Sequence, residues 1–284
     1  MWPRRWPSAM SGDDGLRQIA SGSPGYPVGL LDLEDPPELY VLGRLGEASG
    51  VAIVGTRRCT RYGVDLSEGY GAAVAGAGWT TVSGLARGID AAAHRGALAT
   101  GGHAVAVLGS GVDVCYPKEN KVIYDRILDL DGAILSEYPP GTPPAKWRFP
   151  ARNRIIAAIS AAVVVVEAAR TGGALITARL AAEIGRPVFV VPGDVDRVAS
   201  EGCNRLLRDG AHPVLGEEDL IEELSLVLGP PPRREAPGQL PPQGMAIEDL
   251  ASFWDMPMSD ALVRVGGLEM AGKVRREGGR VFPS

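Results

Sequence analysis

Short, uninterrupted apolar runs recur along the middle of the chain. They are rich in β-branched residues, do not alternate with polar residues, and cover residues 51–54, 80–82, 104–108, 133–135, 163–166 and 188–191. Strands that are buried on both faces of a parallel sheet have this pattern. We therefore predict six buried strands.

Between the apolar runs lie glycine-bearing loops and longer segments with apolar positions at helical spacing. These segments cover residues 61–77, 88–100, 118–130 and 174–185. A repeated order of strand, loop and helix predicts an α/β fold with a doubly wound, mostly parallel sheet. In such a sheet, ligands bind beyond the carboxyl ends of the strands, where the strand-to-helix loops gather.

The composition divides the chain into four predicted parts. Residues 1–45 form a lead-in rich in proline and glycine, residues 46–228 form the sheet domain, and residues 229–244 form a proline-rich, semi-rigid linker. Residues 245–284 form a small C-terminal domain.

The C-terminal part has the outline of a winged helix-turn-helix. Two short helices are predicted at 247–253 and 259–271, followed by strands at 273–276 and 280–282 that Gly278 and Gly279 would turn into a hairpin. The sequence leaves open whether such a domain binds duplex DNA, a partner protein or a second copy of the chain, because a fold does not fix a function.

Bulk properties place limits on function. The chain has 284 residues, 45% hydrophobic residues and a net charge of −5, so binding to nucleic acid would have to depend on a local basic surface. Cys59, Cys115 and Cys203 have neither metal-ligand nor redox spacing, and we expect them to be structural. No apolar stretch is long enough to span a bilayer, so we expect no membrane association and a cytoplasmic location.

Arginines follow the first two predicted strands. Arg57 lies in a glycine loop with no acidic residue between positions 51 and 64, and the helix behind it would offer free N–H groups to an anion. After the second strand come Ser83 and Gly84, then Arg87 and Gly88. We expect Arg87 to face an anion or a carboxylate such as Asp90, and His94 to be a packing residue on the following helix.

Two later segments also carry candidate binding residues. Residues 146–154 interleave aromatic and cationic side chains on a predicted loop, and no acidic residue occurs from 138 to 166. A single strand of nucleic acid suits such a loop, because its bases stack while its phosphates pair with arginine. The alternative is a solvated basic turn whose aromatics pack inward. After the fifth strand, Gly172, Gly173 and Thr177 would present N–H groups and a hydroxyl to phosphate.

Catalytic signatures are missing from the sequence. There is no phosphate loop ending in Gly-Lys-Ser/Thr, and residues 109–114 lack the third glycine of a dinucleotide fingerprint. No histidine or cysteine cluster has metal spacing, and no nucleophile has an evident base. The residues therefore predict a protein that is not an enzyme and has neither a metal nor a cofactor.

Five motifs occur in order along residues 26–228: Val54-Gly55-Thr56-Arg57, Ser83-Gly84-Leu85-Ala86-Arg87-Gly88-Ile89-Asp90, Gly111-Val112-Asp113 with Tyr116-Pro117-Lys118-Glu119-Asn120, Ser136-Glu137-Tyr138-Pro139-Pro140-Gly141, and Phe149-Pro150-Ala151-Arg152-Asn153-Arg154-Ile155-Ile156. In this combination the chain resembles the DNA-processing protein A (DprA/Smf) family. The tail, through residues 247–251 and 268–274, is similar to the small winged-helix domain of that family.

The resemblance implies an extended Rossmann-like domain that binds single-stranded DNA. It also implies a homodimer that helps to load RecA recombinase onto DNA taken up in natural transformation, in a family not known for enzymatic activity. Carried over motif by motif, the residues that line the DNA pocket are Arg57, Arg87, Arg152, Asn153 and Arg154. Together with backbone amides near Gly84 and Gly173, the arginines would contact phosphates. Many members have a serine where this chain has Gly172, so one hydroxyl contact is missing here.

Two other functions remain open at this point. A nucleotide phosphoribohydrolase would use a related sheet and a Pro-Gly-Gly-x-Gly-Thr-x-x-Glu loop, but residues 171–177 match this loop only in part and lack the glutamate. A scaffold protein would bind partners through its tail and no nucleic acid through its loops.

Overall fold

The computed structural model describes residues 15–46, 49–231, 240, 244–254, 258–270 and 274–283. The chain forms two compact units, Met1–Pro232 and Arg233–Ser284. Each unit has its own hydrophobic core.

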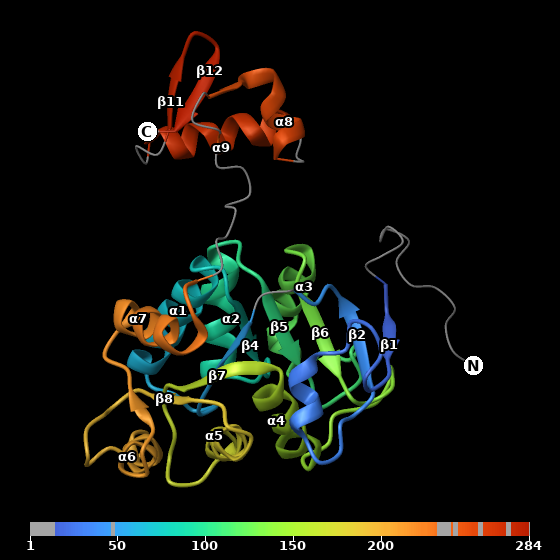
Figure 1. The fold of residues 1–284 in the computed structure, drawn as a ribbon, viewed down its shortest axis with the longest axis vertical. Coiled ribbons are helices and arrows are strands. Elements are labelled where there is room, and N and C mark those ends of the chain that lie inside the picture. The colour runs from blue at the N-terminus through green and yellow to red at the C-terminus, as the bar shows by residue number, and fades with distance from the viewer. Residues whose placement is uncertain are drawn as a thin grey trace. The chain divides into compact units, whose positions relative to one another are not determined.

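The first unit is built on a nine-stranded sheet with the order β1-β2-β6-β5-β4-β3-β7-β8-β9 (Figure 1). The strands from β6 to β9 in this order run parallel, whereas β2 is antiparallel to β6 and β1 is antiparallel to β2. The strands are β1 Arg17–Ile19, β2 Leu39–Gly43, β3 Gly50–Val54, β4 Thr80–Ser83, β5 Ala104–Val107, β6 Ala133–Ser136, β7 Ser160–Val165, β8 Val188–Val190 and β9 His212–Pro213.

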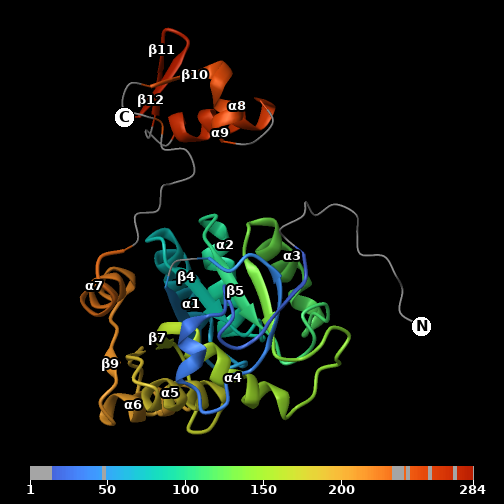
Figure 2. The ribbon, with the colours of Figure 1, turned by 45° about the vertical axis from the view of Figure 1, so that its right-hand side comes forward.

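Helices cover both faces of this sheet, as Figures 1 and 2 show. One layer contains α1 Arg61–Gly76, α2 Ile89–Ala99, α3 Lys121–Asp129 and α7 Glu217–Leu228, and the other contains α4 Arg148–Ala158, α5 Gly173–Glu183 and α6 Glu201–Arg208. Short 3-10 helices are η1 Val28–Asp32 and η2 Lys118–Asn120.

The two helix layers explain the unbroken apolar runs. Along β3, Val51 and Ile53 pack with α1, α2 and α7, whereas Ala52 and Val54 pack with α4 and α5. Successive side chains of a strand point to opposite faces, so a strand covered on both sides has no polar position. The predicted doubly wound, mostly parallel α/β sheet is confirmed, and all six predicted strands are present.

The sheet extends beyond the predicted strands. β1 and β2 come from the segment predicted as a lead-in, so residues 17–43 belong to the sheet unit rather than to a separate part of the chain. β9, of two residues, was too short to leave an apolar pattern. β1 and β9 lie at the edges of the sheet, where fewer positions are buried, whereas β2 lies between β1 and β6 and has four of its five residues buried.

The largest correction concerns residues 146–154, which were predicted to form a loop. Helix α4 begins at Arg148 and continues through Ala158, so most of the basic segment is helical. Pro150 lies in the first turn, where a proline costs no hydrogen bond because the N–H groups of that turn lack intrahelical partners. The proline therefore marks the start of a helix and not a loop.

The C-terminal unit contains the predicted helices and hairpin. Its elements are β10 Met245–Ala246, η3 Ile247–Asp249, α8 Leu250–Phe253, α9 Met258–Met270, β11 Val274–Glu277 and β12 Arg280–Pro283, with the strand order β10-β12-β11. Gly278 and Gly279 both have positive φ, as a tight hairpin turn requires. The assignment as a winged helix stays a prediction, and most of the predicted linker lies outside the described residues.

The packing of α1 against α2 gives a test of the fold. A Cβ atom on Gly71 would lie 2.1 Å from the carbonyl oxygen of Ala93, whereas a Cβ atom on Gly76 of the same helix would meet nothing within 4 Å. We expect Gly71→Ala to lower the free energy of unfolding by about 1–3 kcal/mol because the helices must separate. Gly76→Ala should be neutral or stabilising, since alanine favours a helix by up to about 1 kcal/mol.

Urea denaturation of the two variants and the parent protein measures this difference. Equal stability of the two alanine variants would contradict the close approach of α1 and α2.

Candidate nucleic-acid interface

The loops that follow the parallel strands gather at one edge of the sheet. We call this edge the crest and define it by residues 55–60, 84–88, 108–120, 137–147 and 166–172, which follow β3, β4, β5, β6 and β7. Because these strands are parallel neighbours, their carboxyl ends meet on the same side. The predicted arginines therefore come close together although they are far apart in sequence.

A pocket opens between these loops. It is lined by Arg57, Gly84, Ala86, Arg87, Tyr116, Pro117, Phe149 and Arg152. We call it the crest pocket. Three guanidinium groups from three separate elements contribute to it, together with two aromatic rings. The fold thus brings together Arg57, Arg87 and Arg152, as the sequence predicted.

The aromatic side of the crest pocket is formed by Phe149 in the first turn of α4. The guanidinium carbon of Arg57 lies 5.0 Å from the centre of the Phe149 ring, and the ring of Tyr116 stacks on Phe149 at a centroid distance of 5.4 Å. A cation this close to a ring face is attracted by the ring quadrupole. Arg57 is exposed and forms no ion pair with any described residue.

Arg152 forms the floor of the crest pocket. The residue is only 3% exposed, and its Nη1 donates a hydrogen bond to the carbonyl oxygen of Val107. Burial lowers the pKa of Arg152 to about 10, so it stays charged at neutral pH. Arg152 therefore lines the crest pocket although the residue is buried, and its pairing with a phosphate stays a prediction.

The loop that carries Gly84 is fixed between Arg152 and Asp90. The carboxylate of Asp90 accepts hydrogen bonds from the backbone N–H groups of Gly84 at 3.1 Å and Ala86 at 3.4 Å. A Cβ atom on Gly84 would lie 2.2 Å from Nη1 of Arg152, so any larger residue here would have to displace this buried guanidinium. Burial raises the pKa of Asp90, and the charge of Arg152 opposes that rise.

Arg87 has a different carboxylate partner from the one predicted. Its Nη2 lies 2.6 Å from Oε1 of Glu119, and both side chains are 63% exposed. Asp90 cannot take this place because it is buried against the backbone of its own loop. The neighbouring Asn120 is buried and donates to the carbonyl oxygens of Leu85 and Ala86, which fixes Glu119 opposite Arg87.

The hydroxyl groups of two predicted DNA-binding residues, Ser83 and Thr177, are turned away from the surface. Ser83 Oγ donates to the carbonyl oxygen of Ile53 at 2.7 Å, and Thr177 Oγ1 donates to that of Gly173 at 3.2 Å. Both side chains are buried. Both hydroxyls therefore hold the backbone at the ends of β4 and α5, and the hydroxyl of Thr177 does not face a phosphate as the sequence suggested. A role of either residue in DNA binding stays a prediction.

The remaining predicted residues are not part of the lining of the crest pocket. Asn153 is buried and donates to the carbonyl oxygen of Gly173 at 3.0 Å, whereas Arg154 pairs with Glu137 at 2.6 Å. Gly172 and Gly173 are exposed at the start of α5, outside the crest pocket. Gly88 caps α2 with a φ of 79°, a conformation that favours glycine.

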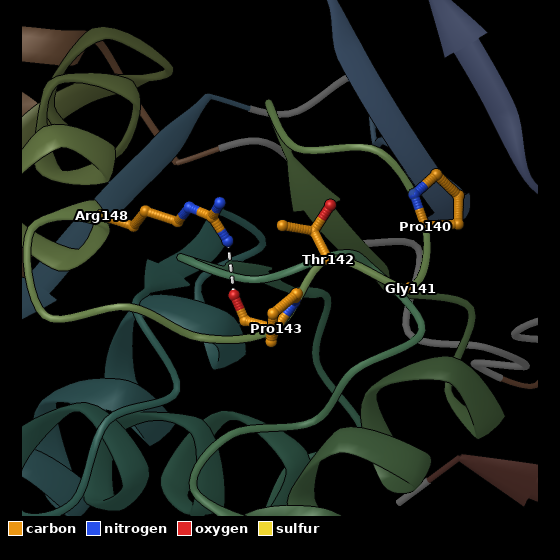
Figure 3. A pocket seen from close by; sticks show the side chains of 5 residues that line it. All are labelled: Pro140, Gly141, Thr142, Pro143 and Arg148. Atoms are coloured by element: carbon orange, nitrogen blue, oxygen red, sulfur yellow. Dashed lines mark hydrogen bonds between the residues drawn. The ribbon is translucent and has the colours of Figure 1, made fainter.

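A second, open depression lies beside the crest pocket. Figure 3 shows its lining, which consists of Pro140, Gly141, Thr142, Pro143 and Arg148. Arg148 reaches across it and donates through Nη1 to the carbonyl oxygen of Pro143. The sequence interpretation did not single out Phe149, Tyr116 or Glu119 individually, although all three stand in the motifs that flank the arginines.

The chain is similar to known proteins over most of its length. Residues 17–225 match the family model of DNA recombination-mediator protein A. The chain belongs to this family. A curated relative, the Smf protein of Synechocystis, is 44% identical over 216 residues, which are 74% of this chain and 54% of the relative, so the match spans about half of the relative's length.

Two solved structures of the family share the fold. DNA processing protein A from Streptococcus pneumoniae has a TM-score of 0.69 and 41% identity, covering 73% of this chain and 74% of the other. The Helicobacter pylori protein has a TM-score of 0.66 and 32% identity, covering 74% of this chain and 95% of the other, and is described as having a unique single-stranded DNA binding mode. The family to which the chain belongs is therefore one of DNA recombination proteins.

The described residues contain neither a metal-binding cluster nor a membrane-spanning helix. No group of three His, Cys, Asp or Glu side chains there has an arrangement that would hold a metal ion. None of the helices in the described part of the chain has the length and apolar character needed to cross a membrane.

The buried His94, whose ring feels the charge of Arg152, gives a test of burial within α2. The ring is fully buried on α2, and neither nitrogen has a hydrogen-bond partner among the described residues. Burial, with a smaller contribution from the charge of Arg152, lowers the pKa of His94 to about 3, from 6.5 for an exposed histidine. As the pH falls below the unfolded value, the unfolded chain takes up a proton that the folded protein does not, so stability declines.

We expect His94→Leu, which is close in volume, to remove this component. Between pH 8 and pH 5 the parent should lose about 2 kcal/mol more of its free energy of unfolding than the variant. Asp90 and Arg152 titrate in both proteins, so the difference between the two pH profiles isolates His94. Chemical denaturation at each pH measures it, and parallel profiles would show that His94 is not buried in a neutral form.

Proposed function

We propose that this protein binds single-stranded DNA in the crest pocket and acts as a recombination mediator that helps to load RecA recombinase onto DNA taken up in natural transformation. The observation that carries the proposal is the convergence of Arg57, Arg87 and Arg152 with the rings of Tyr116 and Phe149 in one pocket. Membership of the recombination-mediator family supports it, as does the single-stranded DNA binding described for the Helicobacter pylori relative.

The pocket suits a single strand better than a duplex. Guanidinium groups pair with phosphates, whereas aromatic rings need an exposed base face for stacking. In a duplex the base faces are covered by their neighbours, so Tyr116 and Phe149 would gain nothing. The local arrangement also outweighs a net charge of −5, because the arginines act at close range and distant charges are screened by salt.

The three arginines have different roles in this proposal. Arg57 is exposed, forms no ion pair with a described residue, and makes the first phosphate contact. Arg87 exchanges Glu119 for a phosphate, because an exposed ion pair contributes little and is easily replaced. Arg152 supplies a fixed positive charge at the floor, and the exposed N–H groups at Gly172 and Gly173 add a neighbouring anion contact at the start of α5.

The partners and location belong to the proposal through the family. We propose a homodimer that acts in the cytoplasm and contacts RecA. The test is whether the purified protein accelerates RecA filament formation on a single strand, and whether the Arg57 variant described below loses this effect. A phosphoribohydrolase activity remains the alternative, and release of free base from a nucleoside monophosphate would support it. No contact among the described residues favours that activity.

The DNA site is tested by comparing Arg57→Gln with Arg44→Gln. Arg44 follows β2 at the opposite edge of the sheet, so its loss removes the same charge away from the crest. We expect Arg57→Gln to weaken binding of labelled oligo-thymidine roughly tenfold, since a hydrogen bond to a charged group is worth about 1.5–3 kcal/mol. The slope of log affinity against log salt should flatten by about 0.7.

Fluorescence anisotropy at several salt concentrations, with unlabelled duplex as competitor, measures both quantities. Equal binding by the two variants, or efficient competition by duplex, would rule out the crest pocket as a single-strand site.

The exchange at Arg87 is tested by Glu119→Gln. Removal of the carboxylate leaves Arg87 free for a phosphate, and we expect about two- to fivefold tighter binding of oligo-thymidine, the range of an exposed ion pair. Asp131→Asn is the matched control, because Asp131 forms an equally exposed pair with Arg44 at the opposite edge of the sheet. Weaker binding by Glu119→Gln would mean that Glu119 positions Arg87 rather than competing with DNA.

A further inference from the structure

A second cluster of aromatic and cationic side chains lies at the crest, outside the crest pocket. The guanidinium carbon of Arg148 lies 4.7 Å from the ring centre of Tyr138 and 5.0 Å from that of Trp147. The two rings meet edge to face at a centroid distance of 6.1 Å. We call these three residues the Trp147 platform.

Trp147 is exposed although it is held in place. The residue keeps 63% of its surface accessible, whereas the other described tryptophans, Trp79 and Trp254, are buried. Large aromatic side chains are usually well buried, so an exposed one on a fixed support requires an explanation. The support is Arg148, which packs on the indole and is itself anchored by the carbonyl oxygen of Pro143 (Figure 3).

The charge around the platform favours an anionic partner. No acidic residue occurs from 138 to 166. The nearest acidic residues along the chain are already engaged, since Glu137 pairs with Arg154 and Glu167 accepts hydrogen bonds from the N–H and the hydroxyl of Thr60. An exposed indole with an arginine behind it, in a region without free carboxylates, is suited to an unpaired nucleobase on a phosphate chain.

The platform is continuous with the crest pocket. Trp147 and Arg148 directly precede Phe149, whose ring lines the pocket, so one short segment supplies aromatic rings to both places. The open depression beside Arg148 leaves room for a strand to pass. We infer that Trp147 stacks on an unpaired base of the strand whose phosphates occupy the crest pocket. This subsite rests on the proposed function.

The test compares Trp147→Leu and Trp147→Phe on two strands of equal length, oligo-thymidine and an abasic strand with the same phosphates. Stacking of one base contributes about 1–3 kcal/mol, so Trp147→Leu should weaken oligo-thymidine binding roughly tenfold. Trp147→Phe keeps a ring and should retain most of the affinity. All three proteins should bind the abasic strand equally, because it has no base to stack.

A spectroscopic signal accompanies the binding measurement. Stacking of a base should quench tryptophan emission in the parent protein, and the quenching should largely disappear in Trp147→Phe. Trp147 is exposed, so we expect both variants to retain the thermal midpoint of the parent.

Several outcomes would overturn the inference. These are unchanged binding of oligo-thymidine by Trp147→Leu, an equal loss on the abasic strand, or a loss of RecA stimulation with DNA binding intact, which would make Trp147 a protein contact. Failure of the proposed function looks different, because the parent protein itself would then not bind oligo-thymidine. If the parent binds and Arg57→Gln weakens it while Trp147→Leu does not, only the stacking subsite is wrong.

Discussion

The crest depends on one buried charge, the guanidinium group of Arg152. Burying a cation costs several kcal/mol unless fixed partners compensate. Here Val107 accepts one of its hydrogen bonds, and the carboxylate of Asp90 lies close enough to interact with it electrostatically. The same carboxylate fixes the backbone of Gly84 and Ala86. The ends of β4 and β5 and the first turns of α2 and α4 are therefore positioned by a single electrostatic arrangement.

This arrangement explains which side chains remain available for a ligand. Because Asp90 is buried and bound to the backbone of its own loop, Arg87 pairs with the exposed Glu119 instead, and Arg57 interacts with Asp90 without forming an ion pair among the described residues. The crest pocket therefore holds one fixed positive charge, on the buried Arg152, and two exposed ones, on Arg57 and Arg87. In the proposed function, the buried Arg152 would place a phosphate, and the exposed Arg57 and Arg87 would adjust to a flexible strand without a change in the fold.

The sequence predicts the fold better than it predicts the roles of individual residues. Apolar runs identify strands that are buried on both faces, and their order identifies the edge at which arginines gather. Burial of a polar residue leaves no such pattern, so Arg152 and Thr177 could not be distinguished from exposed ligands such as Arg57. Helix α4 was missed because its first turn carries Arg148 and Pro150, whose composition resembles that of a loop. The pairing of Arg87 with Glu119 depends on Asn120, which docks its segment onto a loop about 35 residues earlier in the chain.

The position of α4 connects these observations. Its first turn faces the crest with Arg148 and Phe149, and its next turn places Arg152 under the pocket and Asn153 against the start of α5. At a helical repeat of about 3.6 residues, Arg148 and Arg152 lie on the same side of the helix, one at the surface and one beneath it. A shift of this helix would therefore move the floor of the pocket, its aromatic wall and the neighbouring loop together. A site built in this way gains geometric precision from the packing of one helix against the sheet, because the second half of α4, residues 155–158, is buried in the core.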